Sequence, residues 1–513
     1  MSHSLTKPLI YTLIATQLSA CMLGPDYVRP KLDVPTEFKE VKGWKPAQPR
    51  DNVIIGKWWE IFNDPQLNEM ENQVAVSNQS ILQAEAQFRQ AEHMVLTAQA
   101  ALSPIATGGA QFNRFLAASG TSVAPSGVRN LIQNSLTMTW QPDLWGSVRR
   151  QIETNVSNAQ ASAATLQALT LSTQATLAAD YFQLKILDAQ KKLLDNNVAA
   201  YAKTLEITKN RYAAGVAAKT DVVQAEAQLE SVRAQAVNLG VQRAQFEHAI
   251  AVLMGKAPAE VSLPQTALNV QIPMIPAVLP SELLERRPDI AVAERKIAAA
   301  NAQIGVAKAA YYPTLNLNLS EGVQSSFLNL NTLYTLAKNY WAFGPAVGAL
   351  TLFDGGAKNA QYKQAMDNYD ASLANYRQTV LTAFQQVEDN LAALRILDEE
   401  TQVQNKAVAA ADEALALTIN QYKAGTVSFI NVMTAQSNAL TNQVTALLLQ
   451  GSRLTAAVQL VTALGGGWNL EMVPDSDQIG GEIKWTDYLI IPGMDQGNKK
   501  ADIESENQKG WLD

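Results

Sequence analysis

The sequence predicts a mainly α-helical protein with a membrane β-barrel portion, built from two internal repeats. Two stretches of 68 residues, 147–214 and 357–424, contain no glycine or proline and are rich in Ala, Leu, Gln and Lys, which are good helix formers. At 1.5 Å per residue, each could form a helix roughly 100 Å long. Such a helix needs other helices to pack against, because propensity alone does not stabilise it. Four shorter segments alternate between apolar and polar residues, which is typical of β-strands with one apolar face.

A duplication relates the two halves of the chain. The segment Ala98–Pro104 matches Ala307–Pro313, and Tyr212–Gly215 matches Tyr422–Gly425. The matched segments are offset by 209 and 210 residues. Because composition alone does not hold a register over such a distance, we infer that the chain contains two copies of one unit.

Each copy is expected to contain a first helix, two strands, a long helix and a return helix. The first copy is expected over 65–256, with a helix at about 66–103, strands at about 105–117 and 130–141, a long helix over 147–214 and a return helix over 216–254. The second copy is expected over 281–465, with a helix at about 289–312, strands at about 314–326 and 340–353, a long helix over 357–424 and a return helix over 426–464. A turn at Gly215 or Gly425 separates each long helix from its return helix, so the two should be antiparallel neighbours.

The long helices are predicted to pack side by side. Apolar residues from Met366 to Leu394 recur at steps of three and four, which is the heptad pattern of coiled coils. Alanines occupy many other positions, so helices that pack on two faces could close into a ring. The helices alone leave a simple antiparallel coiled-coil rod as an alternative.

The alternating segments favour the ring. Each is close to the 9–11 residues that a tilted membrane strand needs, and Trp140, Trp145, Tyr311 and Tyr312 lie near the strand ends, where interfacial aromatic residues are found. Four strands cannot close a membrane barrel, since the smallest such barrels have eight. The chain must therefore oligomerise, with eight strands from two copies or twelve from three. A soluble four-stranded sheet that caps the helices is the alternative.

The N-terminus has the pattern of a bacterial lipoprotein. An apolar run over 9–18 leads into Leu-Ser-Ala-Cys21, and Cys21 is the only cysteine of the chain. This resembles the box at which a lipid is attached to the cysteine sulfur and the preceding residues are removed; a plain secretory signal is the alternative. We therefore expect a signal peptide over 1–20, a lipidated segment over 21–64 and a covalent lipid on Cys21. Met22 favours the outer membrane, because an aspartate there retains lipoproteins in the inner membrane.

Composition argues against several other classes of protein. The net charge of −7 disfavours nucleic acid as a partner. The three histidines lack metal-ligand spacing, and no nucleophile, phosphate-loop or zinc motif is present, so we predict no enzyme activity, no metal and no cofactor besides the lipid. The proline-rich segment 257–280 is expected to be a linker at the middle of the rod. The polar tail 466–513 is expected to be partly disordered.

Three motifs resemble the TolC-type outer-membrane efflux factors, in their NodT or OprM-like lipoprotein branch. They start at Cys21, Trp58 and Arg286 and read Cys-Met-Leu-Gly-Pro-Asp-Tyr-Val-Arg-Pro, Trp-Trp-Glu-Ile-Phe-Asn-Asp-Pro-Gln-Leu and Arg-Arg-Pro-Asp-Ile. The match extends from Cys21 to about Gly467. The resemblance implies a homotrimer with a twelve-stranded β-barrel in the outer membrane and a twelve-helix barrel across the periplasm. It also implies a periplasmic adaptor and an inner-membrane transporter, of the RND type, as partners.

In this family the helix-turn tips close the inner end of the tunnel. The matching tips are Tyr212–Val223 and Tyr422–Thr434. The resemblance implies a latch between Tyr422 and Asp221, with Thr220 beside it, and an ionised acceptor would strengthen such a bond. Asp221 or Thr220 could instead cap the return helix.

The second tip departs from the family pattern at three positions. The family's arginine is matched by Val427, and its two ring-forming aspartates are matched by Asn431 and Thr434. The chain is therefore expected to lack the arginine link and the acidic cation-binding ring. Asn431 amides would line the constriction in their place.

The function expected from the resemblance is that of an exit duct. It would passively conduct drugs or other small molecules exported by the inner-membrane pump. The duct would be anchored by lipid, span the outer membrane and extend into the periplasm. One alternative is an exit duct for type I protein secretion. The other alternative is a structural protein and not a transport protein, namely a lipid-anchored periplasmic coiled-coil scaffold without a pore.

Overall fold

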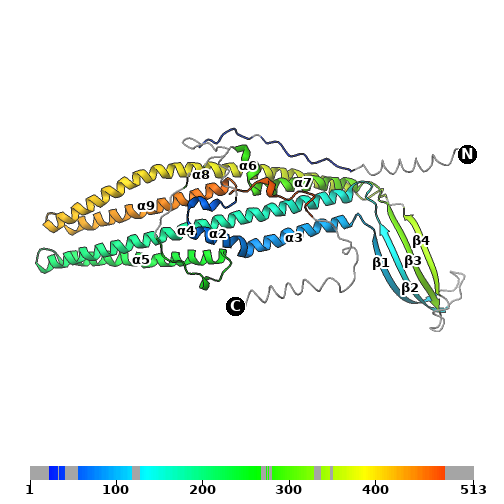
Figure 1. Ribbon diagram of the computed structural model, residues 1–513, viewed down its shortest axis with the longest axis horizontal. Coiled ribbons are helices and arrows are strands. Elements are labelled where there is room, and N and C mark those ends of the chain that lie inside the picture. Colours follow the sequence, from blue (N-terminus) through cyan, green and yellow to red (C-terminus); the bar gives the residue numbers. More distant parts are fainter. Residues whose placement is uncertain are drawn as a thin grey trace.

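The computed structural model describes residues 22–32, 34–40, 56–117, 127–266, 273, 275, 280–327, 337–346 and 350–479. Within these residues the chain is an elongated rod of helices that ends in a small sheet (Figure 1). The long helices α4 (Ser147–Ala213) and α8 (Ala357–Ala424) run along the rod. The predicted fold class, mainly α with four strands per chain, is confirmed. The expected signal peptide, Cys21, part of the linker (267–272, 274 and 276–279) and the tail beyond 479 lie outside the described residues.

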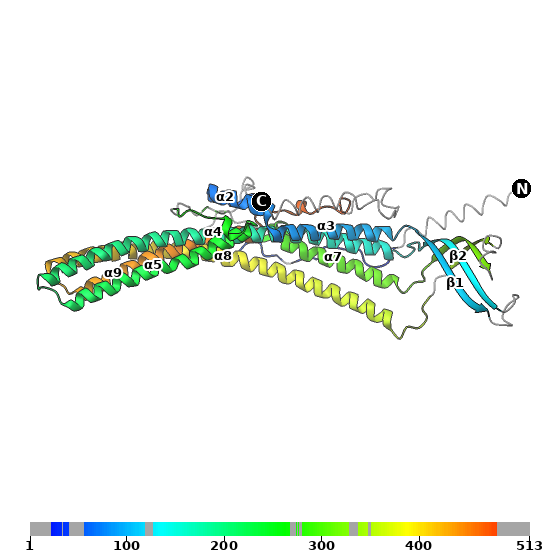
Figure 2. The same cartoon turned by 90° about the horizontal axis from the view of Figure 1, so that it is seen from below.

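The rod has two halves, because α4 and α8 pass through both while shorter helices occupy one half each (Figure 2). In the half next to the sheet, α3 (Gln79–Ala100) and α7 (Pro288–Ala309) pack against α4, and α7 also packs against α8. In the tip half, α5 (Lys219–Leu253) packs against α4, and α9 (Phe429–Ala463) packs against both α4 and α8. Each half therefore places four helices side by side.

Among the described helices, α9 alone is long and apolar enough to cross a membrane by those two measures. It packs antiparallel along α8 through the tip half of the rod. The apolar residues of α9 thus supply the contact faces of a helical hairpin.

The first helix of the first copy is two helices, which corrects the single helix expected over 66–103. Helix α2 (Pro65–Ser77) ends at Asn78, and α3 begins directly after it. The Asn78 Oδ1 atom accepts hydrogen bonds from the N–H groups of Ser80 and Ile81 at 2.9 and 3.1 Å. The Asn78 Nδ2 atom donates to the Leu253 carbonyl at the end of α5, at 2.7 Å. Asn78 therefore caps the start of α3 and joins this point of the chain to the end of α5. These hydrogen bonds favour a break between α2 and α3 over one continuous helix.

Other boundaries also shift from the expected ones. The return helices start three residues later than 216 and 426, because the residues between each glycine turn and helix are extended at Ala218 and Ser428. A short helix, α6 (Pro280–Arg286), precedes α7, which ends at Ala309 and not at 312.

The sheet is antiparallel, in the order β1-β2-β3-β4. Its strands are β1 (Ile105–Ala117), β2 (Gly127–Trp140), β3 (Asn316–Phe327) and β4 (Ala337–Ala346). The fourth strand ends at Ala346, before the expected 353. Pro345 pairs with Leu317 but has no N–H group, which weakens the ladder at this end. The first and last strands are the edges of the sheet, and within the described chain neither edge has a second partner strand.

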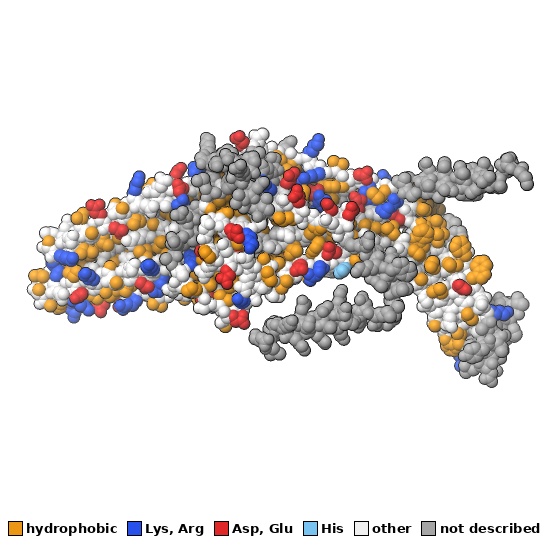
Figure 3. Space-filling view, in the orientation of Figure 1, with side chains coloured by type: hydrophobic (Ala, Val, Ile, Leu, Met, Phe, Trp, Pro, Cys, Tyr) orange, Lys and Arg blue, Asp and Glu red, His pale blue; other side chains and the backbone are white. Residues whose placement is uncertain are grey.

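The register gives the sheet one apolar and one polar face. Paired residues project from the same face, and the pairs put Leu136, Glu321 and Trp341 in one row. The apolar face also carries Phe112, Ile132, Met138, Leu319, Val323 and Phe343, and the polar face carries Gln111, Gln133, Ser135, Thr137, Asn318, Ser320, Gln324 and Tyr340. Hydrophobic side chains gather over this end of the molecule (Figure 3). Glu321 is the acidic exception on the apolar face.

Segments outside the two repeats cover the middle of the rod. The short helix η2 (Trp58–Phe62) buries its aromatic rings, and Phe62 packs against Phe182 of α4 with ring centroids 4.9 Å apart. Arg243 of α5 donates to the Leu263 carbonyl at 2.6 Å, which fastens the described part of the linker at this height. Nearer the sheet, Ile479 packs against Val95 of α3 and Ala159 of α4 in a small apolar cluster.

Glu71 of α2 supports a prediction about pH. The side chain is fully buried, and neither carboxyl oxygen has a hydrogen-bond partner among the residues that the structure describes. Burial raises the pKa of the Glu71 carboxyl from 4.5 to about 9, so the folded protein holds an uncharged acid at neutral pH. In the unfolded chain the same acid ionises near its ordinary pKa. Glu71 therefore lowers the free energy of unfolding progressively as pH rises from about 4.5 to about 9, by at most about 1.4 kcal/mol per pH unit.

We expect Glu71→Gln to remove this dependence. The variant should match the parent in thermal unfolding midpoint near pH 5 and exceed it at pH 8, as followed by the helical circular dichroism signal. An equal difference between variant and parent at both pH values would show that the Glu71 carboxyl is not held uncharged.

Candidate gate at the helical hairpin tips

Each helical hairpin ends in the same glycine turn. In the first, the N–H groups of Gly215 and the next residue donate to the carbonyls of Tyr212 and Arg211, both at 2.9 Å. In the second, the N–H groups of Gly425 and the next residue donate to Tyr422 and the residue before it, both at 3.0 Å. The two glycines have φ values of 74° and 81°, which residues other than glycine rarely adopt. This pattern terminates a helix while pairing its last carbonyls.

An apolar core joins the two hairpins directly behind the turns. The rings of Tyr422 and Phe429 pack edge to face with centroids 5.8 Å apart, and both side chains are buried. Leu205, Leu229 and Val232 of the first hairpin are buried in the same cluster. Within one chain, the two tips therefore form a single packed unit.

Arg211 of α4 binds the end of α8. Its Nη1 atom donates to the carbonyl oxygens of Tyr422 at 2.5 Å and Lys423 at 3.1 Å. Its guanidinium carbon lies 4.6 Å from the centre of the Tyr422 ring, in a cation–π contact. The carbonyls at the end of a helix carry partial negative charge, so a cation there is favourable. Arg211 is thus a direct, charged link between the two tips.

The expected Tyr422–Asp221 latch is not among the hydrogen bonds of the described residues. The Tyr422 hydroxyl instead donates to Thr208 Oγ1 at 3.4 Å, in the buried interior of the tip. Asp221 is the third residue of α5, and its backbone N–H donates to the carbonyl of Ala218. Ala218 is the capping residue and contributes no side-chain bond. The interpretation of Asp221 or Thr220 as the helix cap is therefore wrong.

The other expected gate residues lie on the surface of a single chain. Thr220, Asn431 and Thr434 are exposed near the starts of α5 and α9. The Thr434 hydroxyl donates to the Ile430 carbonyl of its own helix at 2.9 Å. Asn431 lies one turn earlier on the same exposed part of α9.

Sequence reasoning gave Arg211 no role in the gate, although the repeat contains a signal for it. The two turns read Arg-Tyr-Ala-Ala-Gly and Gln-Tyr-Lys-Ala-Gly, so an arginine in the first copy stands opposite Gln421 in the second. The duplication predicts similar turns, so an arginine at a position where the other repeat has glutamine is a departure that indicates a role specific to the first repeat.

The described tip residues form two glycine turns, an apolar core and a cation bound to helix-end carbonyls. In the part of the chain that the structure describes, no three His, Cys, Asp or Glu side chains are grouped so as to hold a metal ion.

Known proteins resemble this chain along most of its length. The family model described as outer membrane efflux protein matches residues 71–256 and 279–466. The toluene efflux pump outer membrane protein TtgC of Pseudomonas putida is 30% identical over 474 residues, which cover 90% of this chain and 96% of that protein. Nodulation protein T of Rhizobium leguminosarum bv. viciae is 29% identical over 88% of this chain and 92% of its own length. The solved structure of the outer-membrane channel OprN has a TM-score of 0.79 and 26% identity, and covers 87% of this chain and 100% of its own.

The two segments that match the family model coincide with the two structural repeats, each of which contains a helix, a strand pair and a helical hairpin. The matched segments include the strands at one end of the rod and the hairpin tips at the other. The pore-free scaffold considered from the sequence is therefore set aside. The chain belongs to the outer membrane efflux protein family, as a channel of the NodT or OprM type located in the outer membrane.

Proposed function

We propose that three copies of this chain form the exit duct of a tripartite efflux system. Each copy would contribute four strands to a twelve-stranded barrel and four helices, in each half of the rod, to a twelve-helix tunnel. The observation that carries this proposal is the sheet, whose two edges have no partner strand among the described residues while one face is apolar. Open edges are not tolerated in lipid, so other copies of the chain have to close the barrel.

The partners follow from the same proposal. A periplasmic adaptor would bind around the hairpin tips, and an inner-membrane transporter of the RND type would drive small molecules into the tunnel. Efflux is favoured over type I protein secretion because TtgC, at 30% identity, is named as an efflux pump protein. The duct itself would need no cofactor besides the lipid on Cys21.

The gate would consist of the tips, with Arg211 holding them together. In this arrangement, Asp221, Thr220, Asn431 and Thr434 would act between copies of the chain. The absence of an acidic ring predicts a constriction without strong preference for cations, since no fixed charge from Asn431 or Thr434 would attract them.

Planar-bilayer conductance of the purified protein, with the oligomer mass measured on the same sample, tests the proposed function. We expect a three-chain particle with small, long-lived openings and weak cation selectivity. A monomeric or dimeric particle without conductance would contradict the duct. A conducting trimer with strong cation selectivity would retain the duct but contradict the uncharged constriction.

A further inference from the structure

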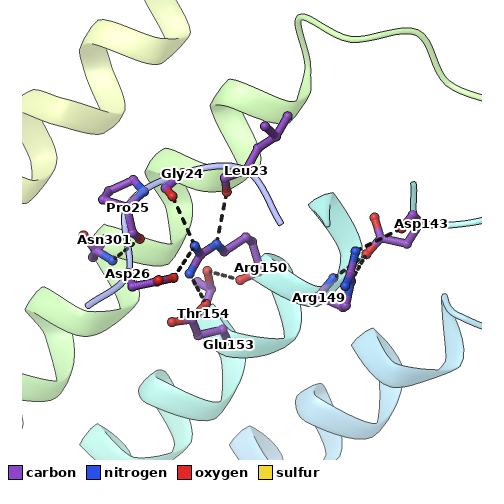
Figure 4. Close-up of polar contacts among 10 residues, drawn as sticks. All are labelled: Leu23, Gly24, Pro25, Asp26, Asp143, Arg149, Arg150, Glu153, Thr154 and Asn301. Atoms are coloured by element: carbon purple, nitrogen blue, oxygen red, sulfur yellow. Dashed lines mark hydrogen bonds and ion pairs between the residues drawn. The ribbon is translucent and has the colours of Figure 1, made fainter. Parts of the chain in front are cut away.

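A buried arginine of α4 binds the N-terminal segment Leu23–Asp26, which begins two residues after Cys21 (Figure 4). The Arg150 side chain is 1% exposed. Its Nε atom donates to the Leu23 carbonyl at 3.1 Å, and Nη2 donates to the Gly24 carbonyl at 3.4 Å and to Asp26 Oδ1 at 3.0 Å. Its Nη1 atom donates to Glu153 Oε2 at 2.7 Å. One guanidinium thus binds three residues of the N-terminal segment while a carboxylate of its own helix holds it in place.

Two further backbone contacts extend this binding. The Asn301 Nδ2 atom of α7 donates to the Pro25 carbonyl at 2.9 Å. The Leu23 N–H group donates to the Trp145 carbonyl at 3.2 Å, just before α4 begins. Each residue from Leu23 to Asp26 therefore makes a polar contact with the body of the protein.

The N-terminal segment also approaches the helices too closely for side chains at two points. Gly24 has a φ of 106°, and a Cβ atom there would lie 2.5 Å from the Cα atom of Gly305 in α7. A Cβ atom on Gly305 would lie 2.7 Å from the Leu23 carbonyl oxygen and 2.8 Å from Cγ of Arg150. The paired glycines bring the segment within reach of the Arg150 guanidinium. We call Arg150, Asn301 and Gly305 the N-terminal seat.

The seat lies beside a group of aromatic residues at the junction of helices and strands. The rings of Trp145 and Tyr312 have centroids 4.9 Å apart. The Trp145 Nε1 atom donates to the Pro313 carbonyl at 2.7 Å, and the Trp140 Nε1 atom donates to the Leu102 carbonyl at 2.9 Å. Tryptophan and tyrosine in such positions mark the boundary between lipid and water.

We propose that the N-terminal seat, with Arg150 as its positioning residue, fixes the acyl anchor at the aromatic boundary against the outer wall of the barrel. This inference rests on the proposed lipid at Cys21. Only Met22 separates Cys21 from Leu23, and consecutive Cα atoms are about 3.8 Å apart, so chain geometry limits an acylated residue 21 to within about 8 Å of the Cα atom of Leu23, which the seat holds. The anchor then fixes how deeply the duct is inserted in the membrane, which an acyl chain on a flexible segment would not do.

A spin label next to the anchor tests the proposal. Met22→Cys supplies a label site, because the Cys21 thiol is consumed by acylation, which intact mass confirms. In the full-length trimer in lipid vesicles, we expect an immobilised label at the level of the headgroups, measured from its accessibility to oxygen and to a water-soluble nickel complex. Arg150→Ala should make the label mobile and broaden its depth, and Arg150→Lys should lie between, since lysine lacks the planar fork. Arg89→Ala, which removes an exposed arginine paired with Glu85 in α3, should change neither quantity.

A second readout protects the test against loss of folding. Lys31 is exposed beyond the seat, and trypsin cleavage after it should be about tenfold faster in Arg150→Ala, the change that corresponds to about 1.4 kcal/mol. Asp26→Ala removes only the contact between Asp26 and Arg150, so it should accelerate cleavage after Lys31 less than Arg150→Ala does. If Arg150→Ala fails to form trimers, Asp26→Ala and Asn301→Ala decide the outcome through label mobility.

Two results would overturn the proposal. One is a parent label that is already mobile and water-exposed. The other is an Arg150→Ala trimer with unchanged label motion, depth and cleavage. An unacylated Cys21 with an immobilised label would instead refute the lipid and retain the seat, so the two failures are distinguishable.

Discussion

Replacing Arg211 with alanine is expected to raise the open probability of the reconstituted channel by about 30-fold. Arg211 donates to the carbonyls of Tyr422 and Lys423, which terminate α8. Hydrogen bonds from a charged donor contribute about 1.5–3 kcal/mol, and a loss of about 2 kcal/mol changes an equilibrium by about 30-fold. Single-channel recording in planar bilayers measures the open probability directly.

Two matched variants accompany this experiment. Arg211→Lys retains the charge but cannot reach two carbonyls and the Tyr422 ring with one planar group, so an intermediate effect is expected. Arg233→Ala removes an exposed arginine that pairs with Glu230 on its own helix, and it should behave as the parent. An unchanged open probability in Arg211→Ala would show that contacts between copies, and not this link, keep the tips closed.

Tyr422→Ala is expected to have the other large effect. The buried ring contacts both Arg211 and Phe429, and removal of a buried aromatic side chain costs about 3–5 kcal/mol. Amide hydrogen exchange at the tips of α8 and α9 should accelerate, and conductance should rise. Because the central core around Trp58 and Phe182 is a separate cluster, exchange in the middle of the rod should stay unchanged.

The duplication supplies the control for this variant. Tyr212 is the equivalent of Tyr422 in the first copy and is 47% exposed, so Tyr212→Ala should change stability by less than about 0.5 kcal/mol. Tyr422→Phe keeps the ring and loses only the 3.4 Å contact with Thr208, so near-parent conductance is expected. If Tyr422→Phe and Asp221→Ala both opened the channel, the latch inferred from the family would operate and the Arg211 link would be secondary.

The long elements could be predicted from the sequence because their signals extend over many residues. Absence of glycine and proline defined α4 and α8 to within one residue, and period-two alternation located the strands, with errors of up to three residues at their starts. The break at Asn78 was missed because its cause is partly tertiary, a hydrogen bond to Leu253 that lies 175 residues away.

The gate was predicted less well, for a related reason. The turns at Gly215 and Gly425 depend on local backbone conformation, which the Tyr-x-Ala-Gly pattern reveals. The contact of Arg211 with Tyr422 joins residues 211 positions apart, and a single sequence contains no record of which side chain reaches which carbonyl. The family pattern indicated a bond between Asp221 and the Tyr422 side chain. In the single chain, the polar contact at this position joins Arg211 to the carbonyls at the end of α8.

The division of the rod into two halves has a mechanical consequence. In the tip half, α4 and α8 extend beyond the central core without α3 or α7 beside them. From Tyr181, in that core, to Ala213 the helix continues for about 50 Å at 1.5 Å per residue. A bend at the middle of the rod would therefore move the hairpins as levers. In the proposed trimer, a rotation of about 5° there would displace the tips by about 4 Å, which would widen the tunnel opening without moving the sheet.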